Sequence, residues 1–191
     1  MNRRSFIAGG FGSACLIPLH SVASASSSGS NPVSAPALLD GGFELPPGSQ
    51  NPWRPFQHAG IRAYDFSRDN EVKVEGAQSL RVSQREIQVF GAVRQTLFNV
   101  PPGSYSAGAM MRSRSIVGKG WRVSLVAMLE NGTLVDAYSA PLRGDVDWTQ
   151  RDVTLTISAR AVTLEVVFEL YADSGTGWAD RASLKFSRLA S

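Results

Sequence analysis

Short runs of β-branched and aromatic residues alternate with polar residues from Leu38 onward, and Gly, Pro, Asn and Asp separate these runs. No long window has apolar residues at the helical period of 3.6, so the pattern predicts strands and few helices. Asn131-Gly132 predicts a tight hairpin turn, because both residues tolerate positive φ. The predicted strands are Leu38–Phe43, Arg62–Phe66, Ser79–Gln84, Val89–Val100, Ser104–Arg114, Trp121–Glu130, Leu134–Ala140, Thr149–Ser158, Val162–Ala172 and Gly177–Arg188. Such strands predict an all-β fold of two packed sheets, a β-sandwich of the jelly-roll type.

Alternation with a period of two assigns the faces of these strands. In Val162–Ala172 the apolar residues fall on one face, and the other face carries Glu165, Glu169 and Tyr171. The last strand places Trp178, Asp180, Ala182, Leu184 and Phe186 on one side. We expect Trp121, Trp148 and Trp178 to lie in the core.

The first residues have the features of an export signal. Arg3 and Arg4 form a basic head, a weakly apolar stretch follows, and Ala23-Ser24-Ala25 is a small-x-small cleavage site. The arginine pair and Phe6 resemble a twin-arginine signal, although Asn2 and Ala8 depart from that pattern. We therefore expect residues 1–25 to be a signal peptide and the mature protein to be periplasmic or secreted. The stretch is too short, and too rich in glycine and serine, for a membrane span.

Cys15 offers an alternative processing site. Gly12-Ser13-Ala14-Cys15 loosely resembles a lipoprotein site, at which Cys15 would carry the lipid. The apolar run continues past Cys15, where a lipoprotein would become polar, so cleavage after Ala25 is the preferred interpretation.

Composition restricts the chemistry of the mature chain. The 191 residues include 19 basic and 16 acidic residues, and removal of the leader takes away two arginines and no acid. The mature chain is thus nearly neutral, and no nucleic-acid partner is predicted. It retains one histidine, His58, and no cysteine, which excludes a disulfide framework and a thiolate zinc site. Residues 26–36 are rich in Ser, Pro and Ala and predict a flexible spacer, and residues 37–191 predict a single domain.

Four segments, in order, resemble carbohydrate-binding modules with the galactose-binding-like jelly-roll fold. They are Leu38–Glu44 with Trp53 downstream, Glu75–Val82, Gln95–Tyr105 and Gly175–Leu184. The matching family patterns are N-G-x-F-E with a later W, G-x-x-S-L-x-V, Q-x-L with P-G-x-Y, and G-T-x-W-x-D-D-V-S-L. The resemblance spans nearly the whole domain and implies the fold more specifically than it implies a ligand, because this fold has many functions.

The resemblance also implies a structural calcium ion. In many of these modules an acid after G-x-F and the first acid of the closing strand hold calcium, and the matching residues here are Glu44 and Asp180. Arg181 stands where the family often has a second acid. Asp180 falls on an apolar face, so a cation, an arginine or backbone N–H groups must compensate its charge.

Sugar binding requires aromatic rings and planar hydrogen-bonding groups. Trp53 lies in a segment without a strand pattern, and Tyr171 lies opposite the apolar face of its strand. The predicted ligand-binding residues are Trp53, Arg94, Arg112, Arg122, Glu169 and Tyr171. Each of these also has a purely structural interpretation, as a packing residue or a solvated charge.

No catalytic set is apparent. The sequence has no Gly-x-Ser-x-Gly motif, and Glu165 and Glu169 on one strand lie about 13 Å apart, too far for a glycosidase pair. We therefore expect an exported, non-catalytic protein that binds a poly- or oligosaccharide. The alternatives are a periplasmic structural or protein-interaction β-sandwich and a small glycan hydrolase or lyase.

Overall fold

The computed structural model describes residues 36–48, 50–57, 63–85 and 90–189, which all belong to one compact unit. The predicted signal peptide, Cys15 and His58 lie outside these residues, as does all of the predicted spacer except Pro36. The described residues contain no helix, and thus none long and apolar enough to cross a membrane. They form eight strands: β1 (Arg54–Gln57), β2 (Tyr64–Asp69), β3 (Ser79–Gln84), β4 (Gly91–Val100), β5 (Gly103–Leu129), β6 (Leu134–Tyr138), β7 (Leu142–Ile157) and β8 (Ala161–Ser187).

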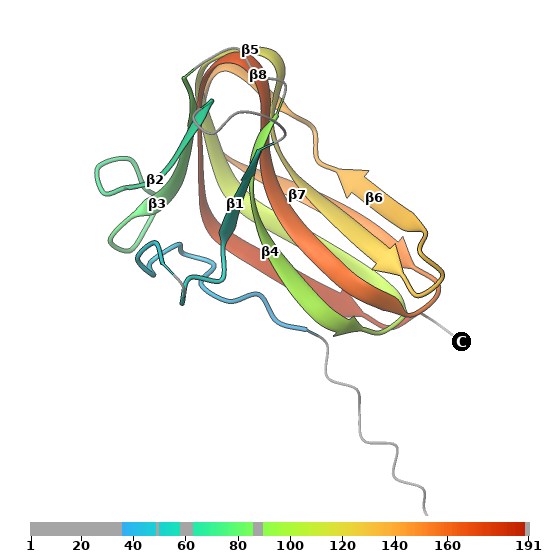
Figure 1. The fold of residues 1–191 in the computed structure, drawn as a ribbon. Helices are drawn as coiled ribbons and strands as arrows, with labels where there is room; N and C mark the ends of the chain where they lie inside the picture. The colour runs from blue at the N-terminus through green and yellow to red at the C-terminus, as the bar shows by residue number, and fades with distance from the viewer. Residues whose placement is uncertain (1–35, 49, 58–62, 86–89, 190–191) are drawn as a thin grey trace, which may run out of the picture. The chain divides into compact units, whose positions relative to one another are not determined.

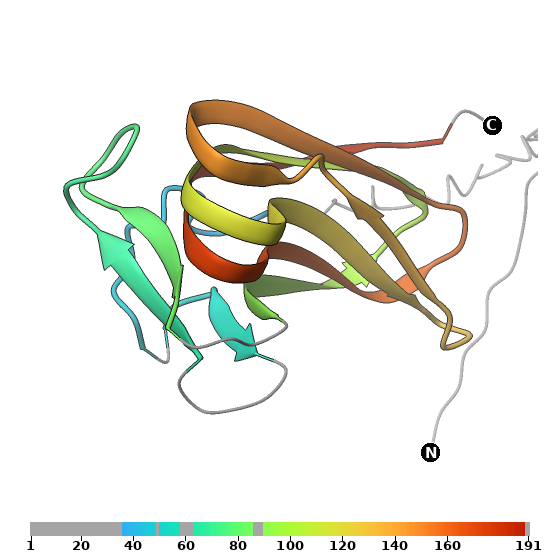
Figure 2. The same ribbon diagram turned by 90° about the horizontal axis from the view of Figure 1, so that it is seen from above.

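Two long, bent strands, β5 and β8, run through both layers of a sandwich (Figures 1 and 2). The first half of β8 pairs with β4 and with the second half of β5, and β1 and β6 form the edges of this first sheet. The second half of β8 pairs with β3 and with the first half of β5, and β2 and β7 form the edges of the second sheet. All pairs are antiparallel, and the β-sandwich predicted from the sequence is confirmed.

The bends explain why the prediction split each long strand in two. The register of β5 against β8 shifts between Arg114 and Gly120, and hydrogen bonding resumes beyond each shift. Gly118, Gly120 and Gly175 have φ values of 112°, 117° and 114°, a region that favours glycine. The sequence pattern breaks at these glycines although the strands continue through them.

The predicted strand Leu38–Phe43 is a turn instead. Asp40 and Phe43 have φ values of 51° and 59°, far from the φ of about −120° to −140° of regular strand residues. The backbone of Leu39 is nevertheless paired, because its N–H donates to Oε1 of Gln95 and its carbonyl accepts from Nε2 of the same side chain, both at 2.8 Å. The buried side chain of Gln95 on β4 thus makes the two hydrogen bonds that a neighbouring strand would make with Leu39.

A bulge near the end of β8 reverses the predicted side-chain alternation. Arg181 has a φ of 54°, and the register against β5 shifts between Asp180 and Ser183. Ala179 therefore faces the core before the bulge, and after the bulge Leu184 and Phe186 pack against the core. Trp178 is buried, as predicted, but the prediction that it shares their face is wrong. It lies on the other side of β8, where its Nε1 donates to the carboxylate of Asp69.

The core between the sheets centres on aromatic rings. The ring of Phe168 lies 5.6 Å from that of Phe43, 5.5 Å from that of Trp53 and 6.1 Å from that of Trp121. Trp121 is fully buried, as predicted, and its Nε1 donates to the carbonyl of Trp178 at 2.9 Å. The predicted core residue Trp148 is only half-buried. This rigid interior holds the outer faces of the two sheets in place.

Candidate functional site

The outer face of the first sheet gathers most of the predicted ligand-binding residues. Core residues alternate along β4, β5 and β8, so the intervening side chains point away from the core. We call this surface the first-sheet face, and it lies on the sheet that is in front in Figure 1. Its principal residues are Phe56, Arg94, Thr96, Lys119, Arg122, Ser124, Tyr138, Glu165, Val167, Glu169 and Tyr171, with Phe90 just before β4. Arg94, Arg122, Glu169 and Tyr171, four of the six predicted ligand-binding residues, thus lie on one surface.

Two ion pairs cross the first-sheet face from the central strand β8. Glu165 accepts hydrogen bonds from Nη1 of Arg94 at 3.1 Å and from Oγ1 of Thr96 at 3.2 Å. Glu169 pairs with Nε of Arg122, which lies directly opposite it on β5. The side chain of Glu169 is only 8% exposed. Both carboxylates are therefore fixed in place by guanidinium groups.

Burial changes the acidity of two groups on this face. Loss of solvent raises the pKa of Glu169 above its ordinary value, and the positive charge of Arg122 opposes that rise. A hydrogen bond to Asp136, assisted by burial, raises the pKa of Tyr138 to about 12. Tyr138 thus stays a neutral phenol at all ordinary pH values.

Aromatic rings flank these ion pairs at both edges of the sheet. On the β1 side, the ring of Phe90 lies 5.9 Å from those of Phe56 and Tyr171. On the β6 side, Tyr138 is 48% exposed, and the guanidinium of Arg122 lies 4.0 Å from its ring centre. Because Phe56 and Tyr138 lie on the two edge strands of five, about 19 Å separates them at the usual strand spacing.

Cations cover one side of several of these rings. Arg94 lies 4.9 Å from the ring centre of Phe56, and Nζ of Lys119 lies 4.2 Å from that of Tyr171. Such contacts hold the rings and the charged groups in a fixed orientation. The face thus combines rigid rings with both donors and acceptors of hydrogen bonds.

Trp53 lies outside any strand, as expected, but it is buried and does not belong to this surface. It is 3% exposed, packs against Phe43 and Phe168, and donates from Nε1 to the carbonyl of Asp40. The segment before β1 folds back over the open edge of the sandwich, which a strand pattern does not reveal. Trp53 forms part of the wall of a cavity of about 240 Å³ at that edge.

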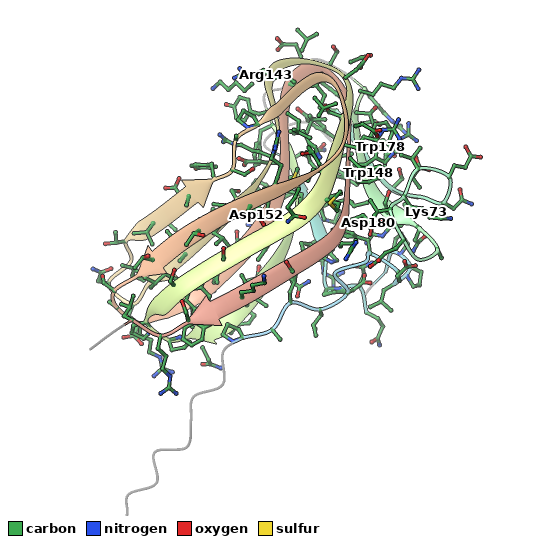
Figure 3. The ribbon with its side chains drawn as sticks, turned by 180° about the vertical axis from the view of Figure 1, so that it is seen from behind. Lys73, Arg143, Trp148, Asp152, Trp178 and Asp180 are labelled. Atoms are coloured by element: carbon green, nitrogen blue, oxygen red, sulfur yellow. The ribbon has the colours of Figure 1, made fainter. Side chains whose placement is uncertain are left out.

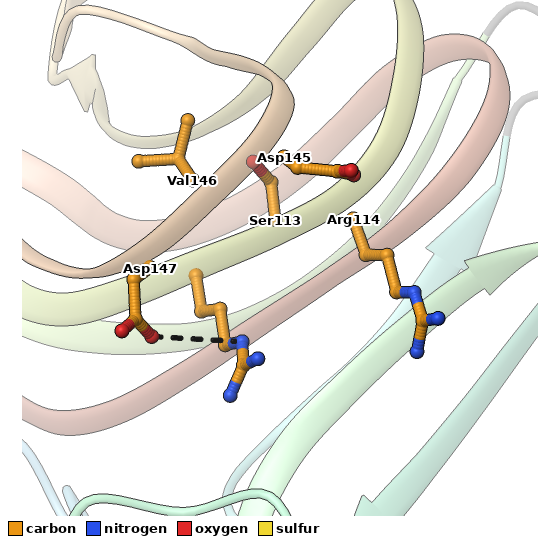
Figure 4. A pocket seen from close by; sticks show the side chains of 6 residues that line it. Ser113, Arg114, Asp145, Val146 and Asp147 are labelled. Carbon is orange, nitrogen blue, oxygen red and sulfur yellow. Dashed lines mark ion pairs between the residues drawn. The ribbon is translucent and has the colours of Figure 1, made fainter.

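Arg112 lies on the second sheet, apart from the other predicted residues. It stands opposite Trp178, 5.9 Å from that ring, and its Nε is 3.8 Å from a carboxylate oxygen of Asp147. It lines a hollow of about 340 Å³ between β5 and β7. Figure 4 shows Arg114, Asp145 and Asp147 of the same hollow. Two arginines and two aspartates leave this hollow without net charge.

The two residues of the predicted calcium site both bind one loop, between β2 and β3. Asp180 is fully buried, and its Oδ2 accepts from the N–H groups of Val74 and Glu75 at 2.8 and 3.1 Å. Both oxygens of Glu44 accept from the N–H of Ala77, at 3.0 and 3.2 Å. Backbone N–H groups, one of the three alternatives predicted from the sequence, thus compensate the charge of Asp180.

This arrangement does not fit a calcium ion well. Calcium needs several converging oxygen ligands, whereas N–H donors point at these carboxylates. No group of three or more acidic, histidine or cysteine side chains suited to a metal occurs in the described part of the chain. Lys73, seen beside Asp180 in Figure 3, donates from Nζ to the carbonyls of Asn70 and Ala77, so an ammonium group already binds carbonyl oxygens of this loop.

Several residues of the first-sheet face were not selected from the sequence. Tyr138 could have been predicted from the sequence, because the Asn131-Gly132 turn sets the register that places Tyr138 opposite Ser124. Phe56 and Phe90 carry no such signal, since β1 is only four residues long and Phe90 precedes β4. Their proximity depends on strand pairing over long sequence distances.

Comparison with known proteins gives fold relatives only. Neither a family model nor a curated protein matches the sequence. Among solved structures, the CBM22-1 xylan-binding domain of Paenibacillus barcinonensis Xyn10C matches with a TM-score of 0.57 and 13% identity, covering 82% of this chain and 98% of that one. TmCBM61 in complex with β-1,4-galactotriose matches with a TM-score of 0.55 and 16% identity, covering 81% and 100%.

Two further matches extend the range of relatives. Family 16 Carbohydrate Binding Module-2 has a TM-score of 0.53 and 24% identity, with 64% of this chain and 86% of that one covered. The enzymatically active domain of bacteriophage CBA120 tailspike protein 4 has a TM-score of 0.58 and 14% identity. The match covers 77% of this chain but only 20% of the tailspike chain. The protein therefore shares the β-sandwich fold of carbohydrate-binding modules.

Proposed function

We propose that this chain is an exported, non-catalytic carbohydrate-binding protein whose first-sheet face binds a poly- or oligosaccharide. The observation that carries the proposal is the arrangement of two Arg–Glu pairs between aromatic rings at both edges of one sheet. Sugar rings stack their C–H surfaces on aromatic rings, and their hydroxyl groups both donate to carboxylates and accept from guanidinium groups. Fold relatives include a xylan-binding domain and a module in complex with β-1,4-galactotriose, which supports this class of ligand.

A binding role suits the two carboxylates better than catalysis. Each is held by an arginine, so neither is a free acid or base placed beside a reacting atom. Glu165 and Glu169 also lie four residues apart on one strand, about 13 Å at the usual rise per residue. This separation exceeds that of a glycosidase pair.

The test is retention of the protein on polysaccharides and titration with soluble oligosaccharides. We expect xylan, β-1,4-galactan or another member of a polysaccharide panel to retain the wild type. Tyr138→Ala removes an exposed ring, and we expect it to weaken binding about tenfold or more. Leu134→Ala is the matched control, because it lies on the same strand and is 59% exposed but is four residues away. Retention that is equal in both variants, or absent on the whole panel, would exclude this site.

Export has its own measurement. We expect the secreted or periplasmic protein to begin at Ser26, which intact mass spectrometry determines. A lipidated chain beginning at Cys15 would contradict that expectation.

A second candidate function is contact with another protein. Beyond the ion pairs, the far end of the first-sheet face carries three exposed apolar side chains: Phe98 (62%), Met128 (42%) and Leu134 (59%). Such a row suits a protein surface better than a sugar. If Leu134→Ala changes the oligomeric state in light scattering and Tyr138→Ala has no effect on glycan retention, this second function is favoured.

A further inference from the structure

A second cavity, separate from the first-sheet face, lies at the open edge of the sandwich between β1 and β2. It has a volume of about 240 Å³, enough for one small ring and too small for a polysaccharide chain. Its lining is Pro47, Gly48, Asn51, Trp53, Arg54, Pro55, Phe66, Arg68 and Val93. Two of these residues are arginines, and none is acidic. Within the described residues, this lining has a net positive charge.

Arg68 is the unusual group in this lining. Its Nε is buried and has no hydrogen-bond partner among the described residues, and no carboxylate there lies within ion-pair distance of it. The guanidinium lies 5.4 Å from the ring centre of Phe43, which fixes its position. Burial lowers the pKa of Arg68, but a guanidinium stays protonated in proteins. The negative charge of Asp40 opposes this lowering and offsets part of the cost of burial, although Asp40 makes no ion pair with Arg68.

The remaining walls are rigid and largely apolar. Asn51 donates from Nδ2 to the carbonyls of Leu45 and Pro46, and its Oδ1 accepts from the N–H of Trp53. Arg54 donates from Nη1 to the carbonyl of Gly48 at 2.9 Å. These bonds link Asn51 and Arg54 to Leu45, Pro46 and Gly48, so residues of the lining are held by the chain itself.

We propose that this cavity binds a small organic carboxylate carried on a six-membered ring, with Arg68 as the partner of the carboxylate. A guanidinium pairs with a carboxylate through two parallel hydrogen bonds, which the terminal Nη1 and Nη2 groups of Arg68 can donate. Trp53 and Phe66 supply apolar contact for the flat or C–H surface of the ring. The ring is either an acidic sugar residue or an aromatic acid, and both share this chemistry.

The experiment is an NMR titration of the full chain that follows the indole N–H signals. Trp53 lines the cavity, and Trp148 on β7, at the opposite edge of the second sheet from β2, is the internal control. We expect sodium glucuronate or sodium benzoate to shift the Trp53 signal saturably and to leave that of Trp148 unchanged. Glucose is the neutral control. A response to glucuronate alone identifies an acidic saccharide, and a response to benzoate alone identifies an aromatic acid.

Two variants make the result specific. Arg68→Met keeps the length of the side chain and removes the charge, and we expect it to weaken carboxylate binding at least tenfold without unfolding the domain. Its melting temperature and the dispersion of its spectrum verify the fold. Arg114→Met, on β5 of the same sheet and in the hollow beside Asp145, is the matched control that retains binding. No shift of Trp53 with either carboxylate, an equal shift with glucose, or unchanged affinity in Arg68→Met would each overturn the proposal, independently of whether the first-sheet face binds a glycan.

Inorganic sulfate tests whether the ring matters. If sulfate shifts Trp53 with the same affinity as the ring carboxylates, the cavity is a simple anion site and the proposed ring recognition is wrong.

Discussion

Glu169 and Arg122 show how a buried charge is maintained on a sheet face. The carboxylate is 8% exposed and has lost most of its hydration, and the guanidinium opposite it supplies the compensating charge. Arg122 in turn lies against the ring of Tyr138, so one arginine links the central strand to the edge strand. The pair therefore determines both local stability and the shape of the candidate binding surface.

Removal of Arg122 leaves a buried carboxylate without its partner. We expect Arg122→Met to lower the free energy of unfolding by about 3–5 kcal/mol at neutral pH, as for other broken buried pairs. Urea denaturation measures this loss. Arg94→Met is the matched control, because its partner Glu165 is 21% exposed and retains Thr96 as a donor. An equal loss in both variants would show that burial of the carboxylate is not the cause.

The raised pKa of Glu169 predicts a pH dependence of stability. The folded protein binds this proton more tightly than the unfolded chain does, because burial disfavours the ionised carboxylate. Its contribution to stability is therefore greatest at low pH and falls as the pH rises from the ordinary carboxyl pKa through the raised value. We expect wild type to lose stability relative to Glu169→Gln across that window in urea melts. A relative gain instead would mean that Arg122 outweighs burial.

At the scale of elements, the loop between β2 and β3 is held by the chain's own groups. Asp69, Glu44 and Asp180 together accept from five of its backbone N–H groups. Burial opposes ionisation of Asp69, but backbone N–H groups and the indole of Trp178 bond to its carboxylate, and its pKa is lowered overall. Three carboxylates thus hold this loop through its backbone N–H groups.

The hydrogen bonds between this loop and Asp180 lead to a prediction about calcium. We expect a chelator, and added calcium, to leave the melting temperature of the domain unchanged, because N–H donors already compensate Asp180. Asp180→Asn should lower the melting temperature, since the amide offers fewer acceptor sites to Val74, Glu75 and Arg181. A fall in melting temperature with chelator would restore the calcium site implied by the family resemblance.

At the scale of the whole molecule, β5 and β8 make the two sheets inseparable. Each strand contributes one half to each sheet, so neither sheet has a complete set of strands without the other. Trp121 and Phe168 pack between them in one continuous core. The sandwich therefore has no internal boundary at which one half could unfold alone.

This continuity predicts a single cooperative unfolding transition. We expect urea curves followed by tryptophan fluorescence and by far-UV circular dichroism to coincide. The fluorescence reports on Trp53 and Trp121 in the core, and the circular dichroism reports on all strands. Two separated transitions would show that one sheet unfolds independently.

The sequence by itself determined the all-β class, most strand positions and the polar face of the first half of β8. These properties are local, because alternation of apolar and polar residues encodes a strand and its buried face. Arg94, Arg122, Glu169 and Tyr171 lie together because each is on the polar face of its own strand.

Only the tertiary structure decided where those strands bend, bulge and pair. Because β5 and β8 bend, Arg112 lies on the second sheet. The bulge at Arg181 places Trp178 on the opposite face from the one predicted. The segment before β1 folds so that Trp53 is buried. The same long-range contacts placed Arg68, whose Nε has no hydrogen-bond partner among the described residues, beside a cavity. The physical reason is that these features depend on partners distant in sequence, which the local pattern of a chain does not encode.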